Sequence, residues 1–203
     1  MHLDDLLARD GLEPPVRLLV LALVAIWRGD WQRLADCARR AQELGQARQD
    51  FEETALQAVL FAGFPRTVTA FETLAAAWPP SSPPAGGALP VADQPAAGRA
   101  LFAAIYGRNE SAVHAMLRGF HPDFHDFVLE AAYGRVLSRP GLSPRVRELM
   151  AVGVLAAQDQ LPQFVGHARG ALHFGATKVE LREVLVSVFG DTAQVDDWLR
   201  RVR

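Results

Sequence analysis

The chain has 203 residues, of which 50% are hydrophobic and 22% are charged, with a net charge of −2. This composition provides enough apolar material for a core and excludes a disordered chain. Because there is no basic surplus to attract a phosphate backbone, we expect no nucleic-acid partner. The one cysteine, Cys37, excludes an intrachain disulfide, a cysteine-based zinc site and a CxxC redox motif.

The N-terminal segment and the apolar runs predict a protein without a membrane partner. Residues 1–14 are acidic, whereas a secretory signal peptide starts with a basic segment. The longest apolar run, residues 18–27, is far shorter than the roughly 20 residues that a helix needs to cross a bilayer. We therefore expect a soluble, cytoplasmic protein.

Helix signals follow one another along the whole chain, and no segment shows the sustained alternation of a strand. Asp30, Ser143 and Thr177 are typical N-cap residues, and glycines such as Gly63 and Gly190 are typical helix stops. These signals predict an all-α fold. The predicted helices cover residues 16–27, 31–44, 49–62, 66–78, 98–106, 111–118, 123–137, 144–158, 162–174, 178–189 and 192–201.

A proline-rich segment divides the chain. Residues 79–95 hold six of the 13 prolines, and such a segment favours an extended connection over a helix. The predicted organisation is an N-terminal part of residues 1–78, a linker of residues 79–95 and a C-terminal domain of residues 96–203.

An internal repeat appears when the sequence is shifted by 130 residues. Residues 14–45 then align with residues 144–175 without a gap, and nine positions are identical, which is more than the composition alone would produce. We interpret this as duplication of a helical hairpin unit, so that residues 1–78 hold a degenerate half-repeat and the two copies pack as a pseudo-symmetric pair. Arg17 and Arg147 occur at equivalent positions, which favours a structural role for both.

Only the second copy carries Glu148 and His167, where the first copy has Leu18 and Cys37. In an antiparallel hairpin, residues equidistant from the turn face each other, and the midpoint of this pair falls at the predicted turn near residue 158. A carboxylate that orients an imidazole gives a proton-transfer pair near neutral pH. The alternative is a buried ion pair that only ties the hairpin together.

Two glutamines and an arginine accompany this pair in the sequence. Gln160 and Gln163 fall on the same helical stripe as His167, so the amides are candidates to line one cavity with it. Arg145 is three residues before Glu148, and its guanidinium could hold a substrate carboxylate by two hydrogen bonds. The alternative for Arg145 is a salt bridge to Glu148 on the helix surface.

Six segments together resemble the carboxymuconolactone decarboxylase family. In chain order they are residues 98–107, 121–127, 133–134, 139–143, 145–149 and 167–177. The resemblance implies an AhpD-like helical fold and loss of CO2 from a γ-lactone carboxylate without a cofactor, with His167 as general acid/base assisted by Glu148. Tyr133 belongs to the same pattern and is a candidate for substrate binding, with a core tyrosine as the alternative.

The related AhpD peroxidases carry a CxxC where this chain has Gln160 and Gln163. Glutamine supplies neither a reactive thiolate nor a resolving partner, so the sequence favours the decarboxylase branch over a peroxidase. A non-catalytic module that binds a ligand or a partner is a further alternative. Family members assemble as rings, so the resemblance also implies a homo-oligomer, either a trimer of two-repeat chains or a dimer.

One histidine cluster is a candidate for a metal. His121 and His125 lie four residues apart, with Asp126 adjacent, but no third histidine is predicted nearby. Helix initiation at Pro122 and Asp123 explains this segment equally well. We therefore expect no metal, while the resemblance implies a small-molecule substrate and no cofactor.

Overall fold

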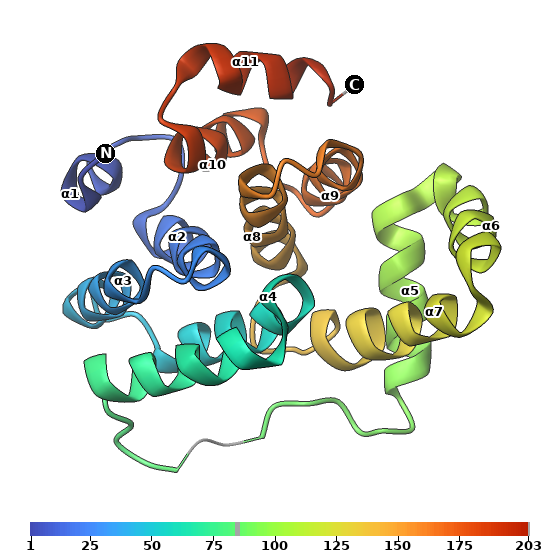
Figure 1. Ribbon diagram of the computed structural model, residues 1–203, viewed down its shortest axis with the longest axis horizontal. Coiled ribbons are helices and arrows are strands. Elements are labelled where there is room, and N and C mark those ends of the chain that lie inside the picture. The colour runs from blue at the N-terminus through green and yellow to red at the C-terminus, as the bar shows by residue number, and fades with distance from the viewer. Residues whose placement is uncertain (84–85, 203) are drawn as a thin grey trace.

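The computed structural model describes residues 1–83 and 86–202, which form helices and connecting loops without any strand (Figure 1). The all-α fold predicted from the sequence is confirmed. In chain order the elements are α1 (Leu3–Leu7), α2 (Pro14–Arg28), α3 (Trp31–Glu43), α4 (Arg48–Ala77), α5 (Gln94–Tyr106), the 3-10 helix η1 (Gly107–Asn109), α6 (Glu110–Phe120), α7 (Pro122–Phe127), the π-helix η2 (Val128–Leu137), α8 (Pro144–Ala157), α9 (Leu161–His173), α10 (Lys178–Phe189) and α11 (Thr192–Arg200). None of these helices is both long enough and apolar enough to span a bilayer.

The predicted helix ends agree closely with the structure, with two informative differences. The helices predicted on either side of Gly63 run on as α4, but Gly63 has φ 74° and ψ 173°, so the helix breaks at the predicted residue. The helix predicted over 123–137 changes character at Val128, where the wider π-helix η2 begins. A π-helix has no simple sequence signature and is frequent at functional sites.

The linker is non-helical over residues 79–83 and 86–90, and α5 already begins at Gln94 within the predicted linker range. Pro84 and Ala85 lie outside the described residues. In Figure 1 the linker runs along one side of the molecule from the end of α4 to the start of α5.

Residues from both sides of the linker form one main hydrophobic core. Helix α2 is buried along most of its length and packs against α3, α4 and α8, while α10 packs against α8 and α2. A second, smaller cluster joins α5 to η2 through Phe102, Ile105, Tyr133 and Leu137. The linker therefore does not separate two independent cores, and α5, α6, α7 and η2 form a lobe beside the main body (Figure 1).

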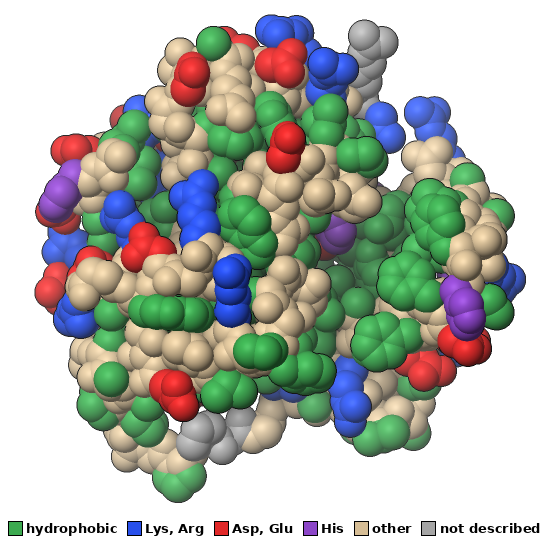
Figure 2. All heavy atoms as spheres, in the orientation of Figure 1, with side chains coloured by type: hydrophobic (Ala, Val, Ile, Leu, Met, Phe, Trp, Pro, Cys, Tyr) green, Lys and Arg blue, Asp and Glu red, His purple; other side chains and the backbone are tan. Residues whose placement is uncertain are grey.

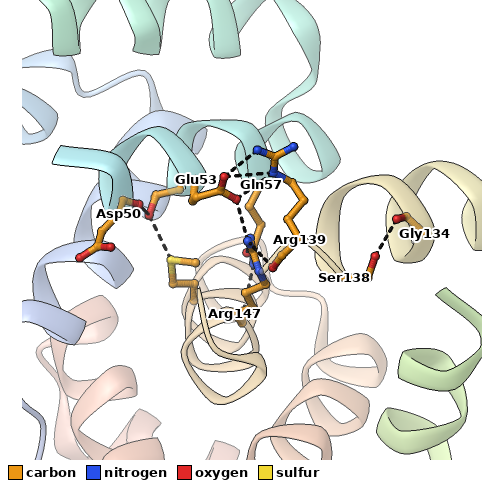
Figure 3. Close-up of polar contacts among 9 residues, drawn as sticks. Asp50, Glu53, Gln57, Gly134, Ser138, Arg139 and Arg147 are labelled. Carbon is orange, nitrogen blue, oxygen red and sulfur yellow. Dashed lines mark hydrogen bonds and ion pairs between the residues drawn. The ribbon is translucent and has the colours of Figure 1, made fainter. Parts of the chain in front are cut away.

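A buried arginine of α8 is neutralised by a glutamate from the other side of the linker. The Arg147 guanidinium donates to the Glu53 carboxylate at 2.7 Å and to the Arg139 carbonyl at 3.0 Å. Arg139 also donates to Glu53, at 2.7 and 2.9 Å, as Figure 3 shows. Burial raises the pKa of Glu53, but the two guanidinium groups outweigh it and hold this pKa below its ordinary value.

The same network recurs 130 residues away. Arg17 donates to the Glu183 carboxylate at 3.1 Å and to the Arg9 carbonyl at 3.2 Å, and Arg9 donates to Glu183 at 2.7 and 2.8 Å. Arg17 and Arg147 are 0% and 1% exposed, which agrees with the structural role predicted for both. In each set, the arginine of one half is paired with the glutamate of the other half. The duplication itself stays a prediction, and the equivalent contacts of Arg17 and Arg147 agree with it.

Candidate active site

Glu148 of α8 and His167 of α9 face each other at the position predicted from the sequence. His167 Nδ1 lies 2.9 Å from Glu148 Oε2, and the two helices are joined by the short turn at residues 158–160. Ser143 caps α8 by accepting a hydrogen bond from the Val146 N–H, and this fixes the start of the helix that carries the carboxylate. Glu148 and His167 are 2% and 9% exposed, so the pair is almost enclosed.

Electrostatics favour the protonated imidazole. Burial lowers the pKa of His167, but the charge of Glu148 and the hydrogen bond to it outweigh burial and raise this pKa above its ordinary value of 6.5. With Nδ1 turned to Glu148, Nε2 makes no hydrogen bond within residues 1–83 and 86–202. The His167 side chain is 11% exposed, so the ring is not completely sealed from solvent. His167 can therefore offer a proton at Nε2.

Two glycines of α9 flank His167 and allow other groups to approach it. A methyl group at Gly166 would meet the ring of Tyr106 at 3.3 Å. A methyl group at Gly170 would meet Glu148 Oε2 at 2.5 Å and Ile105 at 3.1 Å. The absence of side chains at these positions thus lets both α5 and the Glu148 carboxylate lie directly against α9.

A similar close approach joins α5 to η2. A methyl group at Gly98 would lie 2.7 Å from the backbone nitrogen of Gly134, so the two backbones pass in contact. This crossing brings Tyr133 of η2 beside Tyr106 of α5, and the Tyr133 hydroxyl donates to the Tyr106 hydroxyl at 3.0 Å. Burial raises the pKa of both tyrosines, and the charge of Glu148 adds to this rise.

A cavity of about 230 Å³ opens where the end of α5 meets α9. Figure 2 shows the surface hollowed between the main body and the lobe of α5 to α7, with largely hydrophobic walls and a histidine side chain visible inside. Neither Glu148 nor His167 is among the residues that line the cavity, although Gly166, next to His167, is one of them. The lining residues are Ala104, Ile105, Tyr106, Gly107, Arg108, Asn109, Gly166, Arg169 and His173.

The structure does not bring Arg145 to this pair. Its guanidinium bonds the Glu180 carboxylate of α10 instead, and Glu180 at the same time forms the capping box of α10 with Thr177. Neither of the two sequence-based roles for Arg145, a substrate clamp beside Glu148 or a salt bridge to Glu148, describes this contact. The reason is that Glu148 turns inward to α9, while Arg145 lies at the first turn of α8, where α10 begins.

Gln160 and Gln163 also lie apart from the enclosed pair. Both are exposed at the start of α9, and the side-chain amide of Gln160 donates to the Gln158 carbonyl at 3.4 Å. For Tyr133, in contrast, the charge of Glu148 contributes to a raised pKa. Of the four residues predicted to bind substrate, Tyr133 alone has a described electrostatic contact with the pair.

The histidines of α6 and α7 form a hydrogen-bonded chain of their own. His125 is buried, its Nε2 lies 2.8 Å from His114 Nδ1 and its Nδ1 lies 2.7 Å from Asp126 Oδ1. His121 points elsewhere and caps α7 by accepting from the Asp123 N–H at 3.1 Å. The structure therefore does not bring together His121 and His125, the two histidines considered as metal ligands. In the described part of the chain, no group of three or more His, Cys, Asp or Glu side chains could hold a metal ion.

Cys37 is fully buried in the core between the helices of the first half. Burial raises the pKa of its thiol to about 12, so the group is not a thiolate at neutral pH.

Comparison with known proteins gives a family match for the part of the chain that carries Glu148 and His167. Residues 122–190 match the model of the Carboxymuconolactone decarboxylase family. This part of the chain is therefore similar to that family. It contains η2, α8, α9 and α10, and hence Tyr133, Glu148 and His167. The resemblance predicted from the sequence is confirmed, and the all-α architecture agrees with the AhpD-like fold that it implied.

Three curated proteins are similar to this chain. Peroxisomal protein 2 of Schizosaccharomyces pombe is 29% identical over 186 residues, which cover 85% of this chain and 84% of that protein. A 4-carboxymuconolactone decarboxylase of Acinetobacter baylyi is 37% identical over 70 residues, 34% of this chain and 52% of that protein. The nitrosuccinic acid decarboxylase npaB of Metarhizium robertsii is 34% identical over 61 residues, 30% of this chain and 43% of that protein.

Sequence reasoning missed Tyr106 as a neighbour of the pair. It also gave no role to His114, whose Nδ1 lies 2.8 Å from His125 Nε2. The signal that marks the approach of α5 was present in the sequence as the small residues Gly166 and Gly170. Glycines four residues apart on one helix permit close contact with another helix.

Proposed function

We propose that this protein is a decarboxylase of small carboxylated or lactone metabolites that uses acid/base chemistry and no cofactor. The observation that supports the proposal is the pair itself. His167 is held by Glu148 at Nδ1, its pKa is raised, and Nε2 is left for a substrate. Such a pair suits protonation of a carbon that has just lost CO2.

The reaction balances without an added redox partner. The bond between the substrate carbon and its carboxylate breaks, CO2 leaves, and the electron pair spreads onto the oxygen of a neighbouring electron-withdrawing group. The His167 imidazolium then gives its Nε2 proton to the carbon and regains a proton from solvent. Glu148 stays ionised, keeps the ring oriented and stabilises the imidazolium.

Two of the similar proteins support this choice by their names. One is named for decarboxylation of 4-carboxymuconolactone and the other for decarboxylation of nitrosuccinic acid. A carbonyl or a nitro group can receive the electron pair that CO2 leaves behind. The shared chemistry is therefore a carboxylate placed next to, or conjugated with, such a group.

The test is CO2 release from a panel of carboxylated γ-lactones and α-substituted succinates, measured for the wild type, His167→Ala, Glu148→Gln and Cys37→Ala. We expect at least one acid to be turned over, with a loss of about 10² to 10⁴-fold in His167→Ala. We expect Cys37→Ala to retain activity. Turnover that survives in His167→Ala would refute the assignment of the proton donor.

The alternatives have distinct signatures. An AhpD-like peroxidase would consume peroxide in a thiol-dependent way, but the buried Cys37 and the glutamines at positions 160 and 163 disfavour this. A non-catalytic binding module would show no turnover, and its ligand affinity would survive in both Glu148→Gln and His167→Ala.

We also propose that the protein acts in the cytoplasm as a homo-oligomer, either a trimer of two-repeat chains or a dimer. Light scattering coupled to size-exclusion chromatography would determine the mass of the assembly. A tagged full-length protein imaged in its own cells would test the location, and a peroxisomal signal would contradict the proposal.

A further inference from the structure

The hydroxyl pair of Tyr106 and Tyr133 has no role in the mechanism above, although the Tyr106 ring lies against Gly166, the residue before His167. We propose that the Tyr106 hydroxyl donates a hydrogen bond to the oxyanion formed when CO2 leaves, and that Tyr133 positions this hydroxyl. The inference rests on the proposed function and adds the group that stabilises the negative charge during the reaction.

The position of Tyr106 carries the first step of the argument. Its ring lies over Gly166, the residue before His167, and it lines the cavity of about 230 Å³ between α5 and α9. A small acid bound in this cavity would contact the phenol from one side while its reacting carbon approaches α9. Tyr133 is 4% exposed and does not line the cavity, so it cannot take this role itself.

The direction of the hydrogen bond carries the second step. Tyr133 uses its single hydroxyl proton to donate to Tyr106 at 3.0 Å. The Tyr106 proton is therefore not needed for this bond, and within the described part of the chain it has no acceptor. Since a hydroxyl that accepts one hydrogen bond donates the next one more strongly, the pair forms a short polarised chain that ends at the ligand.

Electrostatics keep Tyr106 protonated. Burial raises the pKa of Tyr106, the hydrogen bond from Tyr133 partly opposes this, and the charge of Glu148 adds to the rise. The phenol is consequently a donor throughout the neutral range. Cationic side chains line the same cavity, among them Arg108, so an anionic ligand is electrostatically favoured there.

The experiment measures binding of an oxyanion analogue by calorimetry. The probe is propionate 3-nitronate, whose planar nitronate group mimics the charge left after decarboxylation, and the control ligand is butyrate, which lacks a second oxyanion. The proteins are the wild type, Tyr106→Phe and Tyr133→Phe, with circular dichroism and thermal melting to verify folding. The change from Tyr to Phe removes one oxygen and leaves the ring packing in place.

We expect the wild type to bind the nitronate more tightly than butyrate. Tyr106→Phe should weaken nitronate binding by about tenfold to a hundredfold and change butyrate binding less than about twofold. Tyr133→Phe should give a smaller loss. The inference is overturned if Tyr106→Phe keeps the nitronate affinity, or if the wild type does not prefer the nitronate to butyrate.

A second measurement isolates the positioning role of Tyr133. The chain has two tyrosines, so the absorbance titration of Tyr133→Phe reports on Tyr106 alone. Because the hydrogen bond from Tyr133 lowers the pKa of Tyr106, we expect that pKa to rise in Tyr133→Phe relative to the wild type. An unchanged titration would refute the positioning role. The proposed function is judged separately, by CO2 release and its loss in His167→Ala.

Discussion

Replacing Gly170 by alanine tests whether the contact between Glu148 and His167 depends on an empty space in α9. The added methyl group would lie 2.5 Å from Glu148 Oε2, whereas ordinary contact begins near 3.4 Å. The oxygen must therefore retreat by about 0.9 Å, which is easy for the end of a flexible side chain. A displacement of this size along the hydrogen bond lengthens it from 2.9 Å to about 3.8 Å, beyond bonding distance.

The predicted consequence is loss of site function in a folded protein. A hydrogen bond to a charged group contributes about 1.5–3 kcal/mol, so we expect roughly a tenfold to hundredfold lower decarboxylation rate and a lower pKa of His167. Proton NMR titration of the imidazole measures that pKa directly, and His167→Gln identifies its resonance. Gly119→Ala is the matched control, because a methyl group at Gly119 meets nothing within 4 Å. A His167 titration that is identical in Gly170→Ala and the wild type would refute the reasoning.

Three further predictions concern stability. Glu53→Gln leaves the Arg147 guanidinium in the core without a carboxylate. Urea denaturation should therefore show a free energy of unfolding about 3–5 kcal/mol lower than that of the wild type, and a loss below about 1 kcal/mol would contradict this. Gly98→Ala places a methyl group 2.7 Å from the backbone of η2, so the free energy of unfolding should fall by about 1–3 kcal/mol and the Tm should be lower. An unchanged Tm would show that the two backbones are free to separate. The pKa of His167 is raised in the folded protein, so the contact of the imidazolium with Glu148 stabilises the folded state. This stabilisation is fully present below pH 6.5 and is lost as the pH rises through the folded pKa. The stability advantage of the wild type over Glu148→Gln should hence shrink as the pH rises above 6.5, and an advantage that grows in that direction would disprove the assignment.

The sequence predicted those features that depend on local rules. Helix ends followed from caps and glycine stops, because these residues satisfy backbone groups within one turn. The pairing of Glu148 with His167 followed in the same way, since both lie nine or ten residues from one turn and the two helices must pack antiparallel.

Contacts between elements distant in sequence were not predictable from those rules. Arg145 pairs with Glu180 because the first turns of α8 and α10 meet, and nothing in the spacing of α8 alone indicates that. The contact of Tyr133 with Tyr106 depends on the crossing of α5 and η2 and on the wide turns of a π-helix. Periodicity arguments assume regular 3.6-residue turns, so they misplace side chains wherever the helix type changes.

The exchanged carboxylates have a consequence for any attempt to work with a fragment. Glu53 stands in the first half and neutralises Arg147 of the second, while Glu183 of the second half neutralises Arg17 of the first. A truncation at the linker leaves a buried arginine and a buried glutamate in each piece without their partners from the other piece. The stretch that matches the family, residues 122–190, is thus only part of the unit that shares this core.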